Sequence, residues 1–320
     1  MKRIAVIGEC MIEFSGKLFG TMNQGFGGDS LNTAIYLKRT ASQLPKPLDV
    51  DVFYVTAMGA DSISNNLVSR WEAERLNTSM VLQDNTRAPG LYLIEVNEEG
   101  ERTFHYWRNG SAAKYLFQHS DIATILEEIE QFDLLFISGI SVAILPEKDR
   151  SHLVSMLHRC KEKGVTIAFD SNFRPALWKA VSHWEETKAV YEAIFAATDI
   201  ALLTFDDEQM LWEDNTPAET LSRLASKGVD TTVVRLGKNG CIAQRLSSGK
   251  AVRVSTVPVQ QVIDSTAAGD SFNGAFLASY LAGYPLRKCC ENANSVAGQV
   301  IQFSGAIIPN DTKLLPKERK

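Results

Sequence analysis

The stretch from Asp264 to Phe276 holds the residue types best suited to chemistry. It reads Asp-Ser-Thr-Ala-Ala-Gly-Asp-Ser-Phe-Asn-Gly-Ala-Phe, so a loop of small residues leads directly into apolar positions at helical spacing. Such a loop points the backbone N–H groups of a helix N-terminus at one place, which favours an anion such as a phosphate. Asp270 stands beside that place, where a carboxylate suits proton abstraction from a hydroxyl nucleophile during phosphoryl transfer. The plainer alternative is that Asp270 only caps the helix.

A second segment, nearer the N-terminus, has side chains suited to binding hydroxyl groups. From Gly27 to Ala34 it reads Gly-Gly-Asp-Ser-Leu-Asn-Thr-Ala and leads into a helical pattern. Paired glycines such as Gly28 and its neighbour let the backbone approach a ligand closely, and Asp29 and Asn32 can hydrogen-bond sugar hydroxyls. The alternative is an ordinary glycine turn in which Asp29 or the serine after it is a helix N-cap.

The elements that must position these residues are short apolar runs alternating with amphipathic stretches. This alternation predicts an α/β fold with a mainly parallel sheet flanked by helices. We also expect a surface loop at residues 42–49 and a frayed tail at residues 309–320. The expected buried strands are Ile4–Gly8, Val52–Met58, Leu134–Ser138, Val165–Asp170, Ile200–Thr204 and Thr232–Leu236, and the expected helices include Leu31–Arg39, Leu153–Lys163 and Pro217–Lys227.

Two regions, residues 9–26 and 78–108, depart from this alternation. The first lacks helical periodicity, and the second contains the runs Ser79–Leu82, Leu91–Val96 and Arg102–Trp107. The last two runs predict a β-hairpin closed by a turn at residues 97–100. Strands inserted into an α/β scaffold have no helix of their own to cover them. We therefore expect a small separate sheet, a β-strand lid or dimer contact, within a single domain of residues 1–320.

Composition and missing motifs exclude several classes of protein. The 320 residues carry a net charge of −5 with no long basic run, so nucleic acid is not an expected partner. The apolar runs are too short for a signal peptide or a membrane span, and the five cysteines lack Cys-x-x-Cys spacing. These features predict a cytoplasmic protein with reduced, buried thiols. The chain lacks P-loop, dinucleotide-binding and Gly-x-Ser-x-Gly motifs, and its five histidines lack metal-ligand spacing.

The two glycine-containing segments together resemble the two signatures of the ribokinase/PfkB superfamily of sugar kinases. The resemblance runs from about Ile4 to about Pro309 and implies a ribokinase-like fold. Within the superfamily, Gly-Leu-Tyr-Leu-Ile-Glu from Gly90 and Gly-Glu-Arg-Thr-Phe-His-Tyr-Trp-Arg-Asn from Gly100 are similar to segments of 2-dehydro-3-deoxygluconate (KDG) kinases.

The resemblance implies roles for residues around the sugar. Asp270 matches the general base that activates the terminal hydroxyl of the sugar. The backbone of Ala267, Ala268 and Gly269 matches an anion hole for the transferring phosphoryl group. The remaining matches contact the sugar acid from the glycine segment and from the lid: Gly28, Asp29, Asn32, Tyr92, Tyr106 and Arg108.

Further matches lie toward the nucleotide. Asn172 and Arg174 match a segment between the sugar and the nucleotide phosphates, where Arg174 also belongs to the catalytic and sugar-binding sets. A nucleotide-binding turn is matched by Leu236, Gly237, Lys238 and Gly240, and Asn294 lies in a helix that would border the adenine. ATP and Mg²⁺ are the implied cofactors.

Residue chemistry supports the assignment of Arg108 independently. An arginine can clamp a carboxylate with two parallel hydrogen bonds, which a sugar acid requires and a neutral sugar does not. Strand alternation places Phe104, Tyr106 and Arg108 on one face. The alternative is a solvent-facing arginine beside lid aromatics that only pack together. For Arg174, the alternatives are a helix cap or an ion pair with Asp170.

Three segments depart from the family pattern. Many members have Asn-x-x-Glu where this chain has Thr204 and Asp207, so Asp207 or Glu208 is either a water-mediated magnesium ligand or part of a helix cap. Ala267 replaces the commoner glycine, and its side chain disfavours positive φ. Glu13 stands where several neutral-sugar relatives have Asp. No direct metal ligand is assigned.

The expected activity is ATP-dependent phosphorylation of KDG at its terminal hydroxyl, giving 2-dehydro-3-deoxy-6-phospho-D-gluconate. The expected partners are this small sugar acid and ATP, with a homo-oligomer as the assembly and neither nucleic acid nor a membrane as a partner. The alternatives are a kinase for a neutral sugar, such as fructose or ribose, and a non-catalytic sugar-binding regulator on the same scaffold.

Overall fold

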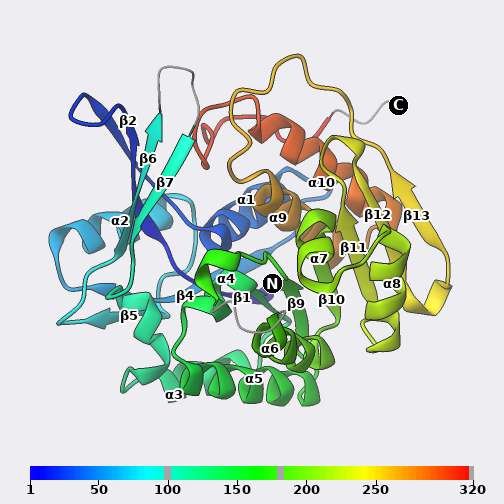
Figure 1. Ribbon diagram of the computed structural model, residues 1–320, viewed down its shortest axis with the longest axis horizontal. Coiled ribbons are helices and arrows are strands. Elements are labelled where there is room, and N and C mark those ends of the chain that lie inside the picture. Colours follow the sequence, from blue (N-terminus) through cyan, green and yellow to red (C-terminus); the bar gives the residue numbers. More distant parts are fainter. Residues whose placement is uncertain (97–101, 179–183, 317–320) are drawn as a thin grey trace.

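The computed structural model describes residues 1–96, 102–178 and 184–316. A nine-stranded sheet runs through its centre in the order β13-β12-β11-β10-β9-β8-β1-β4-β5, and neighbouring strands are parallel except that β12 is antiparallel to both β11 and β13 (Figure 1). This confirms the predicted α/β class. The strands are β1 (Lys2–Ile7), β4 (Val50–Gly59), β5 (Val81–Asp84), β8 (Leu134–Ser138), β9 (Thr166–Asp170), β10 (Ile200–Thr204), β11 (Thr231–Arg235), β12 (Cys241–Arg245) and β13 (Ala251–Val254).

Both faces of this sheet are buried under helices. In β1, Ile4 and Val6 pack into one core, while Ala5 and Ile7 pack into the core on the opposite face. The first core is covered by α1 (Asp29–Gln43), α2 (Ser62–Ala73), α9 (Ala268–Leu281) and α10 (Leu286–Val300). The second is covered by α3 (Ile122–Ile129), α4 (Gly139–Ile144), α5 (Glu147–Glu162), α6 (Glu185–Ala197), α7 (Phe205–Trp212) and α8 (Pro217–Ser226). The six predicted strands correspond to β1, β4 and β8–β11, with ends shifted by at most two residues.

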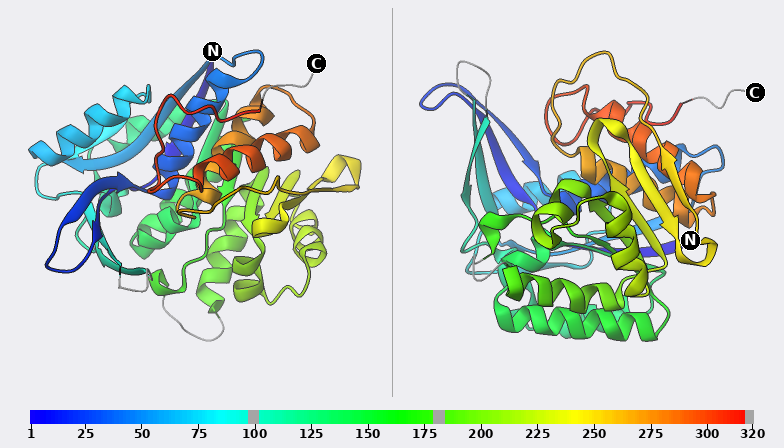
Figure 2. Two further views of the ribbon diagram at one scale, coloured as in Figure 1. Left: turned by 90° about the horizontal axis from the view of Figure 1, so that it is seen from above. Right: turned by 45° about the vertical axis from the view of Figure 1, so that its right-hand side comes forward.

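A second sheet of four strands stands away from the main body, in the order β3-β2-β6-β7 (Figure 2). It consists of β2 (Met11–Gly16), β3 (Met22–Gly27), β6 (Gly90–Val96) and β7 (Arg102–Trp107). The hairpin strands were predicted, and the turn between them lies outside the described residues. The assignment of Ser79–Leu82 to the lid was wrong: β5 pairs in parallel with β4, at the edge of the main sheet.

The tail at residues 309–320 was predicted to be frayed, which is wrong for its described part. Leu314 and Leu315 are buried in the first core. The backbone N–H of Leu314 donates to Gln43 Oε1 at 2.9 Å, and Ser295 donates to its carbonyl at 3.3 Å. The two leucines, overlooked among charged neighbours, provide the apolar area that holds this segment on α1 and α10.

The cysteines are free thiols, and the helices are those of a protein without a membrane-spanning helix in its described part. All five cysteines are free and buried, as predicted. Within residues 1–96, 102–178 and 184–316, no helix has the length and apolar character needed to cross a membrane.

The helices α1 and α9 pack unusually closely because Gly274 has no side chain. A Cβ placed on Gly274 would lie 2.6 Å from both the Leu37 nitrogen and the Thr33 oxygen of α1. These are backbone atoms within a helix, so they cannot move aside independently. The contact fixes the distance between the N-terminal halves of α1 and α9.

Gly274→Ala should therefore lower the free energy of unfolding by about 1–3 kcal/mol, because overpacking outweighs the better helix propensity of alanine. Urea denaturation measures this change. Gly298→Ala in α10 is the matched control, since its Cβ would meet only Val259 Cγ1 at 3.4 Å, and it should leave stability equal or higher. A Gly274→Ala protein as stable as wild type would contradict the close-packing argument.

Candidate active site

Strands of the main sheet deliver polar side chains to one edge. Glu9 follows β1, and β8, β9, β10 and β11 end at Ser138, Asp170, Thr204 and Arg235. Neighbouring parallel strands end side by side, and the crevice beyond their carboxyl ends is where open α/β sheets bind ligands. Both loops singled out in the sequence approach this edge.

A buried ion pair ties the strand ends to the first turns of α9. Arg235 Nη2 donates to the two Asp170 oxygens at 3.0 and 3.1 Å and to Thr204 Oγ1 at 3.0 Å. Asn273 of α9 donates to Asp170 Oδ2 at 2.6 Å, and Arg235 Nη1 donates to the Gly269 carbonyl at 3.4 Å. Each charge has several hydrogen-bond partners, which offsets its loss of water. The pair thereby fixes the start of α9 on the sheet.

Asp270 is half-buried in the first turn of α9 and faces Asn32 of α1. Asn32 Nδ2 donates to Asp270 Oδ2 at 2.8 Å. Burial and the nearby charge of Asp29 raise the pKa of Asp270 to about 7, against the lowering effect of the Asn32 hydrogen bond. A carboxylate with this pKa is suited to accept a proton near neutral pH.

Asp29 is held by neutral donors beneath Asp270. Its Oδ2 accepts hydrogen bonds from Asn172 Nδ2 at 2.9 Å and from the Ser138 hydroxyl. Burial raises the pKa of Asp29 above its ordinary value. The capping alternative is wrong for Asp29, because Gly28 occupies the N-cap of α1 and no side chain caps it. It is also wrong for Ser30, which is buried and hydrogen-bonds Tyr54.

Ala267 takes the left-handed conformation that its side chain disfavours. Its φ is 59° and its ψ is 14°, and it is the N-cap residue of α9. The loop thus has the geometry that glycine adopts without strain, and alanine bears a local cost. The N–H of Ala268 donates to the Ser265 carbonyl at 3.2 Å, and Ala267–Gly269 lines the cavity at the positive end of the helix dipole.

The lid contributes an aromatic wall and one arginine. Tyr106 is 53% exposed, and its ring lies between those of Phe104 and Tyr92, at centroid distances of 6.3 and 5.9 Å. Arg108 Nη2 donates to Glu9, which is 2% exposed. Arg108 therefore faces the cavity with part of its guanidinium engaged, so a ligand carboxylate would share it with Glu9.

Arg174 reaches the cavity from the loop after β9. The alternative of an ion pair between Arg174 and Asp170 is wrong, because Arg235 pairs with the Asp170 carboxylate instead. Its Nη1 lies 3.3 Å from Asp207 Oδ1, and half of the Arg174 side chain is exposed. Burial raises the pKa of Asp207 to about 6, against the effect of Arg174.

The other acidic neighbour has a structural role. Glu208 is fully buried and pairs with Arg223 at 2.7 Å, so it does not face the site. The suggested helix cap is also wrong, because Thr204 makes no side-chain cap and instead accepts hydrogen bonds from Arg235. Asp207 is left as the residue that fits a water-mediated magnesium role. Among the described residues, no three His, Cys, Asp or Glu side chains form a metal-binding group.

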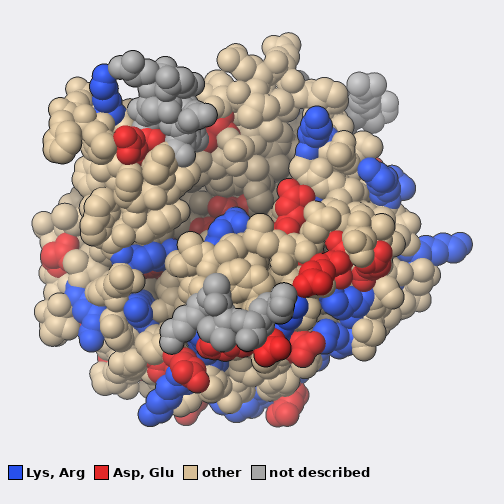
Figure 3. Space-filling view, in the orientation of Figure 1, with Lys and Arg blue, Asp and Glu red and all other residues tan. Residues whose placement is uncertain are grey.

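These groups surround a cavity of about 470 Å³ between the lid and the main body. Figure 3 shows this face hollowed, with acidic and basic side chains inside the hollow. The lining includes twelve of the predicted site residues: Gly28, Asp29, Asn32, Tyr92, Tyr106, Arg108, Asn172, Arg174, Ala267, Ala268, Gly269 and Asp270.

The other five predicted residues lie outside this lining. Leu236, Gly237, Lys238 and Gly240 form the turn between β11 and β12, around the 3₁₀ helix η4 (Gly237–Asn239). Asn294 Nδ2 donates to the carbonyls of Val254 and Ser255 at 3.3 and 3.4 Å. A Cβ on Gly240 would lie 2.0 Å from the same Val254 carbonyl. The turn and Asn294 thus meet at the chain that leaves β13.

Sequence reasoning missed the polar residues that hold the predicted ones. Glu9, Ser138 and Arg235 stand at or just after strand ends, and Asn273 lies one helical turn after Asp270. The rule that ligands gather at carboxyl ends of parallel strands would have selected the first three. Spacing of three residues on α9 would have selected Asn273.

Comparison with known proteins identifies the family. The model of the pfkB family of carbohydrate kinases matches residues 1–313. The chain belongs to this family. A 2-dehydro-3-deoxygluconokinase of Haemophilus influenzae is 47% identical over 308 residues, 96% of each chain. That of Escherichia coli K12 is 42% identical over 311 residues, 97% of this carbohydrate kinase and 98% of the relative.

The fold is also that of solved kinases. A candidate ribokinase II of Escherichia coli, solved in complex with ATP and Mg²⁺, superposes with a TM-score of 0.81 at 20% identity. The match covers 96% of this carbohydrate kinase and 94% of the solved chain. The ribokinase-like fold expected from the two glycine segments is confirmed.

Proposed function

We propose that this carbohydrate kinase transfers the γ-phosphoryl group of ATP to the terminal hydroxyl of 2-dehydro-3-deoxy-D-gluconate. The observation that carries the proposal is the position of Asp270, which lies in the first turn of α9 and lines the same cavity as Arg108 of the lid. One cavity thereby offers a base, an anion site and a carboxylate-binding arginine. The similarity of 42–47% to 2-dehydro-3-deoxygluconokinases supports the same substrate.

In the proposed reaction, Asp270 accepts the proton of the terminal hydroxyl as that oxygen attacks the γ-phosphorus. The bond between the γ-phosphorus and the β–γ bridging oxygen breaks, and ADP leaves with the electron pair. Asn32 keeps the Asp270 carboxylate turned toward the cavity through its 2.8 Å hydrogen bond. The backbone of Ala267–Gly269 stabilises charge on the moving phosphoryl oxygens.

The sugar acid would lie across the cavity with its carboxylate toward the lid. Arg108 donates to this carboxylate, and Tyr92 and Tyr106 pack against the carbon chain. Asp29 and Asn32, which both line the cavity, bind hydroxyls. Arg174 lies where it can bridge substrate and phosphate.

The nucleotide would extend from Ala267–Gly269 toward the turn that contains Gly237 and Lys238, with Asn294 beside the base. Arg174 lines the cavity, and Asp207 lies behind it with its Oδ1 3.3 Å from Arg174 Nη1. Bound magnesium neutralises phosphate charge during transfer, and Asp207 would hold it through water, since Mg²⁺ needs only one or two protein carboxylates beside phosphate oxygens. The cytoplasmic location and the homo-oligomer stay predictions.

Asp270→Asn should lower kcat by about 10²–10⁴-fold, because an amide cannot accept the proton but keeps the shape and the Asn32 contact. A coupled assay of ADP formation with KDG measures kcat, and equilibrium titration with ATP should give a Kd within about twofold of wild type. Turnover near the wild-type rate would contradict the role of Asp270 as general base.

Arg108→Ala should raise KM for KDG by tenfold or more, because the carboxylate loses a charge-assisted hydrogen bond of about 1.5–3 kcal/mol. The same coupled assay, run across KDG concentrations, measures KM. Arg87→Ala is the matched control, since Arg87 pairs with Asp84 outside the cavity.

The Arg108 substitution leaves Glu9 buried without its partner, which lowers stability. The double variant Glu9→Gln/Arg108→Ala removes that charge and should show the same rise in KM. An unchanged KM for KDG in both proteins would favour a neutral-sugar kinase.

A further inference from the structure

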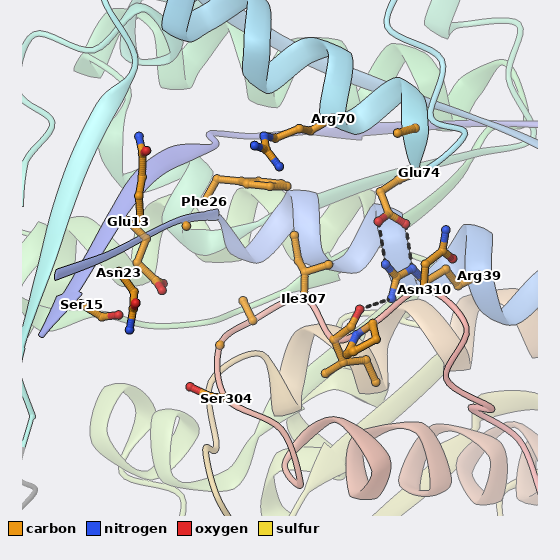
Figure 4. A pocket seen from close by; sticks show the side chains of 17 residues that line it. Glu13, Ser15, Asn23, Phe26, Arg39, Arg70, Glu74, Ser304, Ile307 and Asn310 are labelled. Atoms are coloured by element: carbon orange, nitrogen blue, oxygen red, sulfur yellow. Dashed lines mark hydrogen bonds and ion pairs between the residues drawn. The ribbon is translucent and has the colours of Figure 1, made fainter.

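A second cavity of about 640 Å³ lies next to the sugar cavity. It is bounded by β2 and β3 of the lid, by α2, and by residues 304–310 (Figure 4). The side chains of Glu13, Phe26, Arg70 and Ile307 surround it. None of the predicted site residues lines this cavity, and Asp270 does not face it.

The linings of the two cavities meet at Gly27. A Cβ placed on Gly27 would lie 3.1 Å from the Tyr92 hydroxyl, 3.8 Å from Asn32 Oδ1 and 3.5 Å from Ala306 Cβ. Tyr92 and Asn32 line the sugar cavity, whereas Ala306 lines the second cavity. Atoms of both linings therefore meet within a few ångströms of one glycine.

Of the side chains that meet at Gly27, Tyr92 lies between the sugar cavity and Glu13. It is 7% exposed and packs in a small cluster with Met11 and Ile94. Its hydroxyl donates a hydrogen bond to Glu13, which pairs with it across β2 and β6. Glu13 lines the second cavity but not the sugar cavity. The tyrosine thus lies between the carboxylate of Glu13 and the sugar cavity.

We propose that Tyr92 determines substrate specificity. Its side chain, held by the hydrogen bond to Glu13, separates the carboxylate of a bound sugar acid from the carboxylate of Glu13. The proposal rests on the proposed function, since it concerns selection of an acid over a neutral sugar. Two like charges in a partly desolvated cavity repel strongly, whereas a carboxylate readily accepts hydrogen bonds from neutral hydroxyls. Removing the tyrosine should therefore disfavour acids and favour neutral sugars.

The experiment compares KM for KDG with the inhibition constant of D-fructose, a six-carbon 2-keto sugar without a carboxylate. In Tyr92→Ala, the ratio of the fructose Ki to the KDG KM should fall by about tenfold. Tyr92→Leu keeps apolar contact with Met11 and Ile94 but does not reach Glu13, so it should change the ratio in the same direction. A general loss of packing would weaken both ligands and leave the ratio unchanged.

Adding Glu13→Gln to Tyr92→Ala should restore the ratio by threefold or more, because the uncovered group is then neutral. In the wild-type background, Glu13→Gln should change the ratio by less than twofold, since Tyr92 still covers it. If the ratio is unchanged in both Tyr92 variants, Tyr92 does not determine specificity and the proposal is overturned. If the ratio falls but Glu13→Gln does not restore it, the role of Glu13 is overturned. Failure of the proposed function itself is distinguishable, because wild-type enzyme would then not phosphorylate KDG.

Discussion

The site depends on the close packing of α9 against α1. Gly274 lets the two helix backbones approach, and the N-terminal turns of both helices consequently open into the same cavity. Asn32 and Asp270 are 238 residues apart in the chain, yet their side chains are 2.8 Å apart. The Asp170–Arg235 ion pair, with Asn273, then fixes α9 to the ends of the strands. A shift of either helix would move the candidate base away from its hydrogen-bond donor.

Charge is divided unevenly among the groups that line the cavity. Glu9 and Asp170 each have an arginine partner, Arg108 and Arg235 respectively. Asp29 and Asp270 are held by amide and hydroxyl donors instead. Burial with only neutral partners, beside another carboxylate, explains why the pKa values of these two acids rise. The arrangement pairs the structural carboxylates with arginines and raises the pKa of the candidate base, Asp270, to about 7.

Sequence reasoning predicted the parallel strands well because their apolar runs are buried on both faces and leave a local signal. It also selected twelve of the residues that line the cavity, from the two glycine segments, the lid hairpin and the segment after Asp170. It missed Arg235 and Glu9, whose roles depend on ion pairs with residues 65 and 99 positions away. It misplaced β5, since a short alternating run does not reveal which sheet edge it joins. The packed tail was missed because two leucines among charges give little periodicity.

The central claim is that Asp270 is a general base whose pKa is raised by burial and by Asp29. The most direct measurement is the pH dependence of kcat/KM for KDG in wild type and in Asp29→Asn. Because a raised carboxyl pKa keeps the base protonated at low pH, kcat/KM should rise with pH, reach half its maximum at about pH 7 and level off above that pH. Asp29→Asn removes the neighbouring negative charge, so the rise of kcat/KM with pH should occur at lower pH in this variant, whatever its maximal rate. A rise at the same pH in both enzymes, or a profile level from pH 5 to 8, would contradict the account.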